Sequence, residues 1–524
     1  LPGNDDLGTM SAWYVWCAIG LYPQNSAVRY LDVGTPLFSS VVLRSPNEPT
    51  IAVATSRSGT GGNYIQGLRV NGAFVRSAWV SVPNRGTLRL DASVGDAPNP
   101  HWADGVGNAP PSFATVPLTL PPSTAVTVSA PVALRMGAGA SKTLDLAVSN
   151  RTGTASSDVA WLATASPGLH VRSAEYIRLA AGEIGTAPLR VSADASLHAG
   201  YYTIVIRGIA SSGVRLAELP VSVRIDRNGE RPQLVYAENA FGNSITPVDL
   251  ATGETGPQIA VGEYPRDAVL SADATRLYVA NLGGSSISVI DTNRDKAIAT
   301  IKAGSSPNGL ALTPDGKTLW FSNADDGTIQ PIDVRTLQTG STIGVGLQPH
   351  TIAIAPDGLT LYVSNRGSNT VTPVDLRTRT TGTAINVGPR PTGIAIAPDG
   401  KRLYVVSGAE GDVTPIELGE NQRALPPIKV GVYPMQIAIT PDGKTAYVSN
   451  YANSTITPID LRTDVAAPPI EVGGAPYGIG ITSNGRVAAV VSHRDNSCVL
   501  LDLGTGRVSR PIPLGSGPYT VAAP

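Results

Sequence analysis

From residue 234 onward, apolar and polar residues alternate in short runs, and the runs recur along the chain. One unit reads PHTIAIAPDG, LTLYVSNRG, NTVTPVDLRT and TGTAINVG. Alternation with a period of two is typical of a strand with one buried face. Pro-Asp-Gly supplies the residues that a tight turn between strands requires. Each unit is therefore predicted to contain four short strands.

Two independent markers fix the number of these units at seven, because both recur every 42 or 43 residues. One is an acidic residue that closes the third strand, at Asp249, Asp291, Asp333, Asp375, Glu417, Asp460 and Asp502. The other is a proline, at residues 265, 307, 349, 391, 434, 476 and 518. Four strands in such a period fit a blade of a β-propeller. The segment GSGPYTVAAP reads as a lone first strand, and we expect it to complete the first blade and close the ring.

The pattern YVSN followed by NTVTPVDLRT resembles the YVTN-type propeller repeats of cell-surface and secreted proteins, and the resemblance covers residues 230–524. It implies a binding platform or a spacer, with a ligand that the repeat does not identify. We interpret the seven acidic residues as turn and strand-end residues rather than a ring of metal ligands, because such side chains bind nearby backbone donors. His350 and His493 have no partner at a ligand spacing and are interpreted as structural or exposed.

Between the proline-rich stretch at 117–122 and the polar linker at 226–232, the chain again alternates. Six or seven short runs, among them KTLDLAVSN and YYTIVIRGIA, predict an immunoglobulin-like β-sandwich over residues 123–229. The Cys, Trp and Cys pattern of antibody domains is absent from this stretch, so only the architecture is predicted. Its expected role is that of a spacer.

The N-terminal segment reads PGNDDLGTMSAWYVWCAIGLYP. Apolar residues at helical spacing between Leu7 and Leu21 predict a helix. Asp5 and Asp6 precede it at N-capping positions, so the residues alone favour a capped helix start. Three aromatic residues lie nearby, Trp13, Tyr14 and Trp16. They could belong to the core that the helix packs on, or their rings could stack on a sugar.

GNDDLGTMSAWYVWCAIGLYP closely resembles the signature of glycoside hydrolase family 92, the calcium-dependent exo-acting α-mannosidases. Further matches follow in the same order: YLDVGTPLF at 30–38, NYIQGLRVNG at 63–72, Trp79, PNPHW at 98–102 and APPSF at 109–113. In that family this stretch is the end of an α-helical toroid followed by strands that return to a β-sandwich. The resemblance implies that residues 1–122 are the C-terminal fragment of such a module. The whole chain is then mainly β, with a truncated glycosidase module, a sandwich and a seven-bladed propeller.

The resemblance implies hydrolysis of α-mannosides with inversion, which requires two carboxyl groups about 6.5–9.5 Å apart, one acting as acid and one as base. It places the base on Asp6, with Asp5 as a supporting carboxylate. A helix N-terminus favours the ionised form that a base needs. The family's general acid is a glutamate upstream of this motif. Ca²⁺ is implied in the active site, with ligands largely outside these residues, and we assign no metal ligand and no substrate-binding residue.

A formal net charge of −1 gives no electrostatic reason to expect nucleic acid as a partner. No apolar run reaches the about 18–20 residues that span a bilayer. Cys17 and Cys498 lie in different modules, so we expect small buried residues rather than a disulfide or a zinc site. The sequence starts at Leu1 inside a motif, without an initiator Met or a signal peptide, and we expect the true N-terminus to lie upstream. An extracellular or cell-surface location is inferred from the two resemblances.

Two functions follow as hypotheses. In the first, the chain is a fragment of a secreted α-mannosidase with accessory β-modules, inactive by itself because the general acid is missing and because the first segment lacks the rest of its toroid. Its substrates are then α-mannoside glycans. In the second, the chain is a non-catalytic extracellular binding or scaffold protein that acts through the propeller. The coding sequence upstream of Leu1 distinguishes the two.

Overall fold

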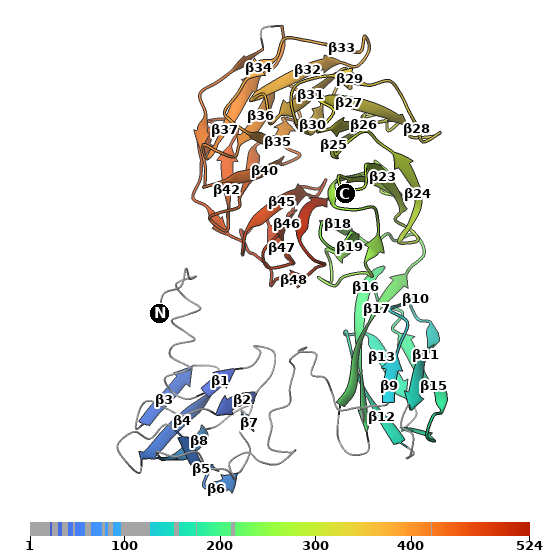
Figure 1. The fold of residues 1–524 in the computed structure, drawn as a ribbon, viewed down its shortest axis with the longest axis vertical. Helices are drawn as coiled ribbons and strands as arrows, with labels where there is room; N and C mark the ends of the chain where they lie inside the picture. Colours follow the sequence, from blue (N-terminus) through green and yellow to red (C-terminus); the bar gives the residue numbers. More distant parts are fainter. Residues whose placement is uncertain are drawn as a thin grey trace. The chain divides into compact units, whose positions relative to one another are not determined.

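A computed structural model describes residues 21–23, 30–33, 40–45, 48–57, 64–75, 79–81, 87–95, 126–150, 157–173, 176–210, 215–420 and 422–524. Within these residues all regular structure is β-strand, which confirms the predicted fold class (Figure 1). The chain divides into two compact units, residues 1–121 and 122–524. The two units are described separately below.

The first unit contains two sheets among its described residues. A three-stranded antiparallel sheet has the order β1 (Leu21–Pro23), β2 (Tyr30–Val33) and β7 (Trp79–Ser81). A five-stranded sheet has the order β3 (Ser40–Ser45), β4 (Glu48–Arg57), β8 (Thr87–Gly95), β5 (Tyr64–Val70) and β6 (Ala73–Val75). Along β8 every second residue from Leu88 to Val94 is buried, as expected for a strand that packs one face on a core.

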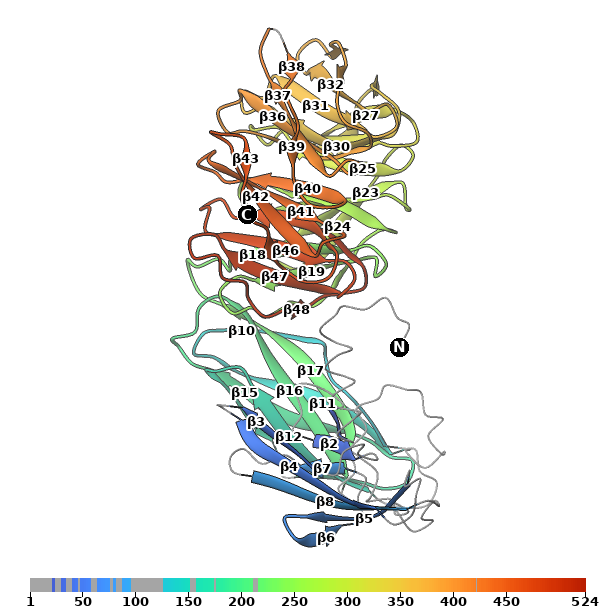
Figure 2. The ribbon, with the colours of Figure 1, turned by 90° about the vertical axis from the view of Figure 1, so that its left-hand side faces the viewer.

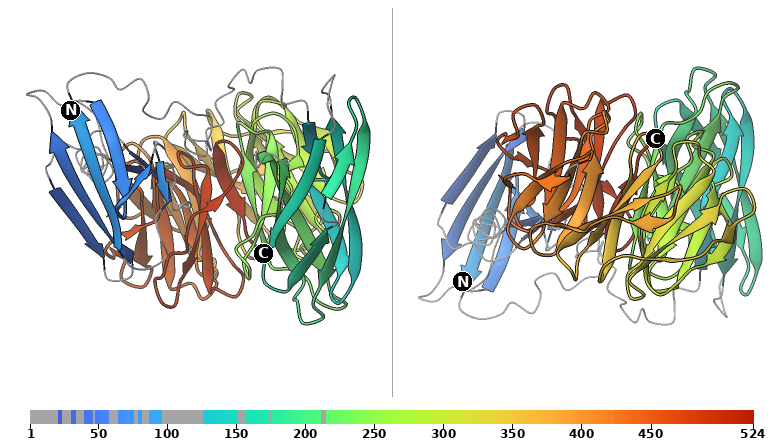
Figure 3. Two further views of the ribbon diagram at one scale, coloured as in Figure 1. Left: turned by 90° about the horizontal axis from the view of Figure 1, so that it is seen from below. Right: turned by 90° about the horizontal axis from the view of Figure 1, so that it is seen from above.

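The sandwich lies in the second unit and consists of two sheets. One has the order β13 (Leu169–Ser173), β15 (Ile184–Ala193), β11 (Ser141–Asn150) and β9 (Val126–Ser129). The other has the order β10 (Ala133–Gly137), β17 (Arg215–Asp226), β16 (Gly200–Ala210), β12 (Ser157–Ala165) and β14 (Tyr176–Leu179). Figure 3 shows these strands from two further directions. The predicted sandwich is confirmed, whereas the narrower designation as immunoglobulin-like stays a prediction.

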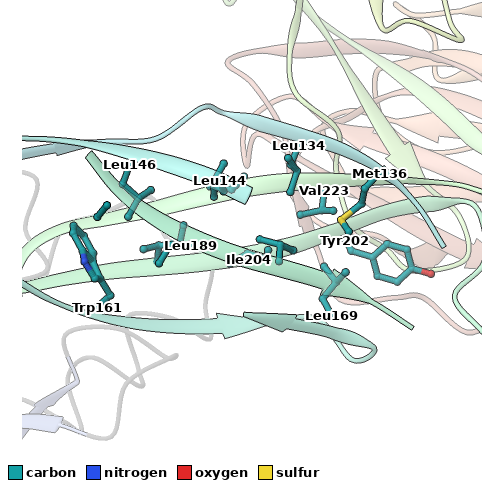
Figure 4. Packing of buried hydrophobic residues seen from close by; sticks show 14 of the residues in the cluster. Leu134, Met136, Leu144, Leu146, Trp161, Leu169, Leu189, Tyr202, Ile204 and Val223 are labelled. Carbon is teal, nitrogen blue, oxygen red and sulfur yellow. The ribbon is translucent and has the colours of Figure 1, made fainter. Parts of the chain in front are cut away.

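The core of the sandwich fills the space between the two sheets (Figure 4). Leu144, Leu146 and Leu189 extend from one sheet, and Trp161, Ile204 and Val223 from the other. In β11 and β15 every second residue is buried, which explains why the sequence alternates there.

Seven blades follow within residues 234–524, of which all but residue 421 are described (Figures 1 and 2). The first blade contains β18 (Leu234–Asn239), β19 (Ser244–Asp249), β20 (Ile259–Ala260) and β49 (Pro518–Ala522). The second contains β21 (Pro265–Leu270), β22 (Arg276–Asn281), β23 (Ser286–Asp291) and β24 (Lys296–Lys302). The third contains β25 (Pro307–Leu312), β26 (Thr318–Asn323), β27 (Thr328–Asp333), β28 (Gln338–Thr339) and β29 (Ile343–Gly344), and the fourth contains β30 (Pro349–Ile354), β31 (Thr360–Asn365), β32 (Thr370–Asp375), β33 (Thr380–Thr381) and β34 (Ile385–Asn386).

The fifth blade contains β35 (Pro391–Ile396), β36 (Arg402–Ser407), β37 (Asp412–Glu417), β38 (Arg423–Ala424) and β39 (Ile428–Lys429). The sixth contains β40 (Pro434–Ile439), β41 (Thr445–Asn450), β42 (Thr455–Asp460), β43 (Val465–Ala466) and β44 (Ile470–Glu471). The seventh contains β45 (Pro476–Ile481), β46 (Val487–Ser492), β47 (Ser497–Asp502) and β48 (Ile512–Pro513). In each blade the first strand pairs with the second and the second with the third. The first strands neighbour one another around the centre of the ring.

A buried asparagine at the end of the second strand holds most blades together. In the fourth blade Asn365 Nδ2 donates to the hydroxyls of Thr370, at 3.1 Å, and of Thr372, at 2.8 Å. Its Oδ1 accepts from the backbone N–H of Gly346, at 3.1 Å. A Cβ at position 346 would lie 2.5 Å from Asn365 Cγ, so the connecting loop can approach only as glycine. Asn450 makes the same bonds in the sixth blade, so the recurring Asn, Thr-x-Thr and Gly there have one physical origin, which is a buried amide with its donors and acceptor satisfied.

The ring closes as the sequence predicted, through strand β49. It pairs antiparallel with β18, with Tyr236 opposite Ala522 and Ala237 opposite Val521. The hydroxyl of Thr520 also donates a hydrogen bond to the carboxyl of Glu238, which is fully buried. β49 is thus the inner strand of the first blade, and it lies beside the inner strands β21 and β45 of the two neighbouring blades.

The sandwich is joined to the propeller through the ring of Tyr201, at the start of β16. Tyr201 has no exposed surface and lies in one core cluster with Leu234, Leu277 and Ile290 of the propeller. A Cβ at Gly256 would lie 2.5 Å from its ring, so the ring fits against bare backbone. Its backbone N–H donates to Asp249 Oδ2 at 2.9 Å. Sandwich and propeller therefore share a core instead of being linked only by the polar segment at 226–232.

Polar contacts surround this shared core. Arg224, on β17, donates to Asp295 Oδ2 at 2.5 Å and to the carbonyl of Thr292 at 3.2 Å, and its side chain is 9% exposed. Thr203 Oγ1 donates to Glu254 Oε2 at 2.7 Å. A buried ion pair of this kind fixes orientation, because either charge would be left buried and unpaired if the contact shifted.

We expect Tyr201→Ala to destabilise the second unit by about 3–5 kcal/mol, since it removes a large buried aromatic side chain and leaves a cavity. Chemical denaturation of the 524-residue chain, followed by circular dichroism and fluorescence, measures the change in the free energy of unfolding. Tyr176→Ala is the matched control, because Tyr176 belongs to the same sandwich and is 56% exposed. Equal effects of the two substitutions would contradict the shared core.

Candidate functional site

The predicted catalytic carboxylates, Asp5 and Asp6, lie outside the described residues, as do Trp13, Tyr14, Trp16 and Cys17. The predicted helix over Leu7–Leu21 also lies outside them, apart from Leu21, which begins strand β1. The matched segments that follow are described in part. YLDV forms β2, YIQGLRV forms β5, and Trp79 begins β7.

The five-stranded sheet of the first unit carries a surface hollow, lined by described residues that include Ser56, Arg69, Phe74 and Asp91. Asp91 is the single carboxylate among those lining residues, and it pairs with Arg89 at 3.3 Å. Inverting hydrolysis requires two carboxyl groups. The lining residues of this hollow therefore do not form a catalytic pair.

Six of the seven acidic residues of the repeat, the aspartates, cap turns as their positions in the sequence predicted, whereas Glu417 pairs with Arg423 at 2.7 Å. Asp375 Oδ1 accepts from the backbone N–H groups of Arg377 and Thr378, both at 2.8 Å. Asp460 and Asp502 make the same pair of bonds in their blades. These bonds lower the pKa of each of the three carboxyls. Asp249 differs, because Tyr201 covers it and burial raises its pKa.

No group of three or more His, Cys, Asp or Glu side chains in the described part of the chain is arranged to hold a metal ion. Cys498 is a free, buried thiol, and burial raises its pKa to about 12, so it behaves as the small apolar residue that the sequence predicted. No helix among the described residues is long and apolar enough to cross a membrane.

Two carboxyl groups lie close together inside the propeller where β49 closes the ring. Glu238 is 0% exposed, and its Oε1 has no hydrogen-bond partner among the described residues. Burial, with Asp267 nearby, raises the pKa of Glu238 to about 8. Asp267 accepts from Leu310 N at 2.8 Å and from Ala268 N at 3.0 Å, and burial raises its pKa to about 7. At pH 7 Glu238 is therefore held mainly in the protonated, uncharged form, and Asp267 is about half protonated.

Sequence reasoning missed both groups, although Glu238 carries a readable signal. The third and fourth blades have Ser322 and Ser364 at its repeat position, and each serine hydroxyl donates to the carbonyl of the residue after the next blade's marker proline. The other blades have Ser, Ala or Val at this position, so Glu238 is the one ionisable residue there, in the blade that β49 completes.

The carboxyl of Glu238 has a higher pKa in the folded state than in the unfolded chain, so the folded state binds more protons. The free energy of unfolding therefore decreases as pH rises from about 5 to about 8. Each such group contributes up to about 1.4 kcal/mol per pH unit within that window. We expect Glu238→Gln to retain the bond from Thr520, to flatten this slope and to be more stable than the natural chain at pH 8. Urea midpoints measured between pH 5 and pH 8 test this.

Asp502→Asn is the control for this series, because Asp502 lies on the outer part of a blade and its pKa is lowered rather than raised. Its contribution is lost only below pH 4, so its slope between pH 5 and pH 8 should match that of the natural chain. An unchanged slope in Glu238→Gln would show that Glu238 is already ionised in the folded protein.

Comparison with protein families places both ends of the chain. Residues 231–523 match the family described as YNCE-like beta-propeller, which is more than half of the sequence. The chain belongs to the YNCE-like β-propeller family. Residues 1–93 match the family described as glycosyl hydrolase family 92 catalytic domain, which agrees with the resemblance seen in the N-terminal motif. The YNCE-like chain is thus a glycosidase-related protein that carries a propeller.

A curated relative matches over 119 residues with 29% identity. It is an uncharacterized secreted glycosidase of Arthroderma benhamiae, and the match spans 22% of the YNCE-like chain and 15% of that relative. The chain therefore corresponds to a small part of the length of the curated relative that it matches.

Solved structures show the fold alone. A functionally unknown protein from Desulfotomaculum acetoxidans DSM 771 has 17% sequence identity, with 56% of this chain and 98% of that chain covered, and a TM-score of 0.50. A putative 6-phosphogluconolactonase from Bacteroides fragilis NCTC 9343 has 18% identity, coverages of 56% and 99%, and a TM-score of 0.48.

Proposed function

We propose that the chain belongs to a secreted hydrolase that releases mannose from α-mannosides with inversion, and that the sandwich and the propeller are accessory modules of this enzyme. The observation that carries the proposal is the match of residues 1–93 to the family 92 catalytic domain. The secreted glycosidase that matches over 119 residues supports the reaction class and the location.

In this proposal Asp6 is the general base, which removes a proton from the attacking water. Asp5 is a supporting carboxylate that orients Asp6 or adjusts its pKa. The family resemblance places the general acid on a glutamate upstream of the motif. The 524 residues by themselves then hold one member of the pair, and we expect hydrolysis only in a protein that also contains that acid.

Calcium is proposed on the resemblance alone. Hard oxygen donors would suit it, but no suitable cluster occurs among the described residues. No ligand is therefore assigned, and the roles of Asp5 and Asp6 are argued without the ion.

We expect Asp6→Asn to reduce mannose release from an α-mannoside by about a hundredfold or more, because an amide cannot accept the proton of the attacking water. The measurement uses the protein encoded by the complete gene, with mannose assayed as product. Asp91→Asn is the matched control, since Asp91 is a carboxylate of the same module paired with an arginine on an exposed sheet. Unchanged turnover in Asp6→Asn would remove Asp6 from the role of base.

Removal of calcium should abolish mannose release by the same protein, and added Ca²⁺ should restore it. A dialysed chelator treatment followed by an assay with and without Ca²⁺ checks this, and added Mg²⁺ tests whether any divalent ion suffices. Full activity after exhaustive chelation would rule out the metal dependence that the resemblance implies.

A second candidate is a non-catalytic extracellular protein that binds its partner through the propeller. It is favoured by the share of the chain that matches the propeller family. A continuous reading frame upstream of residue 1 that encodes the remainder of the hydrolase module supports the enzyme, whereas a start codon close to residue 1 supports the binding protein.

A further inference from the structure

The first strands of the blades present one residue each to the centre of the ring, directly after the marker proline. In six blades the pairing register of the first strand shifts at this residue, and in the remaining blade the register shifts between Ala237 and Asn239 of the partner strand. Such bulges re-aim side chains and occur often beside functional sites. The residues at this level are Arg266, Asn308, His350, Thr392, Met435, Tyr477 and Tyr519.

Four of them, with Arg366 from the connection after β31, are called here the ring-centre cluster: Arg266, His350, Tyr477, Tyr519 and Arg366. Arg266 Cζ lies 3.6 Å from the ring centroid of Tyr519, and its Nη2 donates to Tyr477 Oη at 3.4 Å. Arg266 belongs to the second blade and Tyr477 to the seventh, so the guanidinium reaches past the inner strand β49 of the first blade, which lies between them.

Both arginines of the cluster retain free donors. The Nε atoms of Arg266 and Arg366 are buried and have no hydrogen-bond partner among the described residues. Within that part of the chain neither arginine takes part in an ion pair. Both arginines are partly exposed, but a buried Nε–H donor without a partner is costly, because its desolvation is not compensated.

Neutral hydrogen-bonding groups at the same level are also unpartnered. His350 is 6% exposed, and its Nε2 has no partner among the described residues, while Nδ1 lies 3.1 Å from Thr351 Oγ1. Thr392 is 3% exposed, and its Oγ1 also lacks a partner there. Burial, with Arg266 and Arg366 close by, lowers the pKa of His350 to about 3, so the imidazole stays neutral. The two arginines therefore supply the positive charge at this level.

Aromatic rings line the same end of the propeller. Tyr477 and Tyr519 have ring centroids 3.6 Å apart. His493 lies 5.3 Å from Phe241 and 6.1 Å from Tyr519, and Phe241 is 59% exposed. Tyr477 and Tyr519 are each 6% exposed, so the ring of Phe241 is the one that can stack on a planar group or on the apolar face of a sugar.

The acidic side chains near this end offset the charge of the arginines only in part. Burial raises the pKa of Glu238 to about 8 and that of Asp267 to about 7, so at pH 7 the first carboxyl is mainly neutral and the second is about half ionised. Asp325 and Asp326 accept from Ser306 Oγ at 2.5 Å and Ser305 N at 2.7 Å, and Asp495 accepts from Gly474 N at 2.7 Å. Each of these three carboxylates accepts a hydrogen bond from a loop residue and none of them from an arginine of the cluster.

The sandwich leaves this end uncovered. Its contacts with the propeller involve Glu254, which follows β19, and Thr292 and Asp295, which follow β23. Because strands in a blade are antiparallel, connections after the third strand lie at the opposite end from the start of the first strand. The cluster therefore lies at the end of the ring that the sandwich does not touch.

We propose that the ring-centre cluster is a binding site for an anionic sugar-sized ligand. The negative group faces Arg266 and Arg366, with His350 Nε2 and Thr392 Oγ1 as further hydrogen-bond partners, and the sugar ring lies against the exposed ring of Phe241. Paired guanidinium groups favour a carboxylate or phosphate, since both present several acceptor oxygens at once. A neutral sugar would leave the arginines unpaired and bind far more weakly.

Titration calorimetry with the 524-residue chain at pH 7 tests this, using D-glucuronate, D-glucose 6-phosphate, D-glucose and sulfate as probes. We expect one of the two sugar anions to bind with millimolar affinity or better, and which one decides between carboxylate and phosphate. Binding should weaken about tenfold or more in Arg266→Gln and in Arg366→Gln. Arg379→Gln is the matched control, because Arg379 is an exposed arginine of the fourth blade at the other end of the ring.

Several results would overturn the proposal: no binding of either sugar anion, equal binding of glucose, or the same affinity in Arg366→Gln as in Arg379→Gln. Sulfate binding as tightly as the sugar anions would eliminate the role of the aromatic rings. Thermal unfolding of each variant checks that the fold is intact. If Arg266→Gln is unstable, Arg366→Gln still decides, since Arg366 lies in a loop and is partly exposed.

Discussion

The propeller depends on one strand pairing, that of β49 with β18, because a ring of blades is stable only when its first and last sheets meet. The pairing joins the first and the last strand of the propeller, which are separated in sequence by all the other blades. The chain must therefore order the intervening blades before β49 can pair with β18. Glu238 lies at this seam. A carboxyl held neutral by burial can accept from Thr520 without the cost of a buried charge, but only while the pH keeps it protonated.

Periodicity made most of the fold predictable, because the same physical requirement recurs in every blade. The buried asparagine Asn365 donates to two threonine hydroxyls, and a glycine lets the connecting loop approach its side chain. The same residue types recur in the sequence where this geometry recurs. The capping aspartates and the Pro-Asp-Gly turns could be interpreted from local chemistry for the same reason. Gly316 and Gly358 adopt positive φ in these turns, as their position in the motif required.

The features that sequence reasoning could not supply are those that join one module to another or depart from the repeat. Tyr201 reads as one alternating residue of a sandwich strand, and nothing near it in sequence indicates that its ring completes the core of a propeller blade. Asp249 reads as one of the six capping aspartates, although it also binds the backbone of Tyr201. Arg266 and His350 each occupy a position where the other blades have unrelated residues, so only the closed ring reveals that they converge. The candidate catalytic residues Asp5 and Asp6 came from the family resemblance, not from a pattern that physical reasoning alone could resolve.

Taken together, the shared core and the ring-centre cluster give the two ends of the propeller different roles. Arg224 with Asp295 and Tyr201 with Asp249 fix the propeller to the sandwich at one end, and a rotation there would expose a buried charge or a buried ring. The end that bears unpaired arginines is thereby held in a constant orientation relative to the sandwich. A flexible tether would need none of these contacts, since the polar segment at 226–232 could join the modules by itself. The retention of a buried aromatic ring and a buried ion pair is consistent with a propeller whose orientation matters, which is what an accessory module that presents a ligand requires.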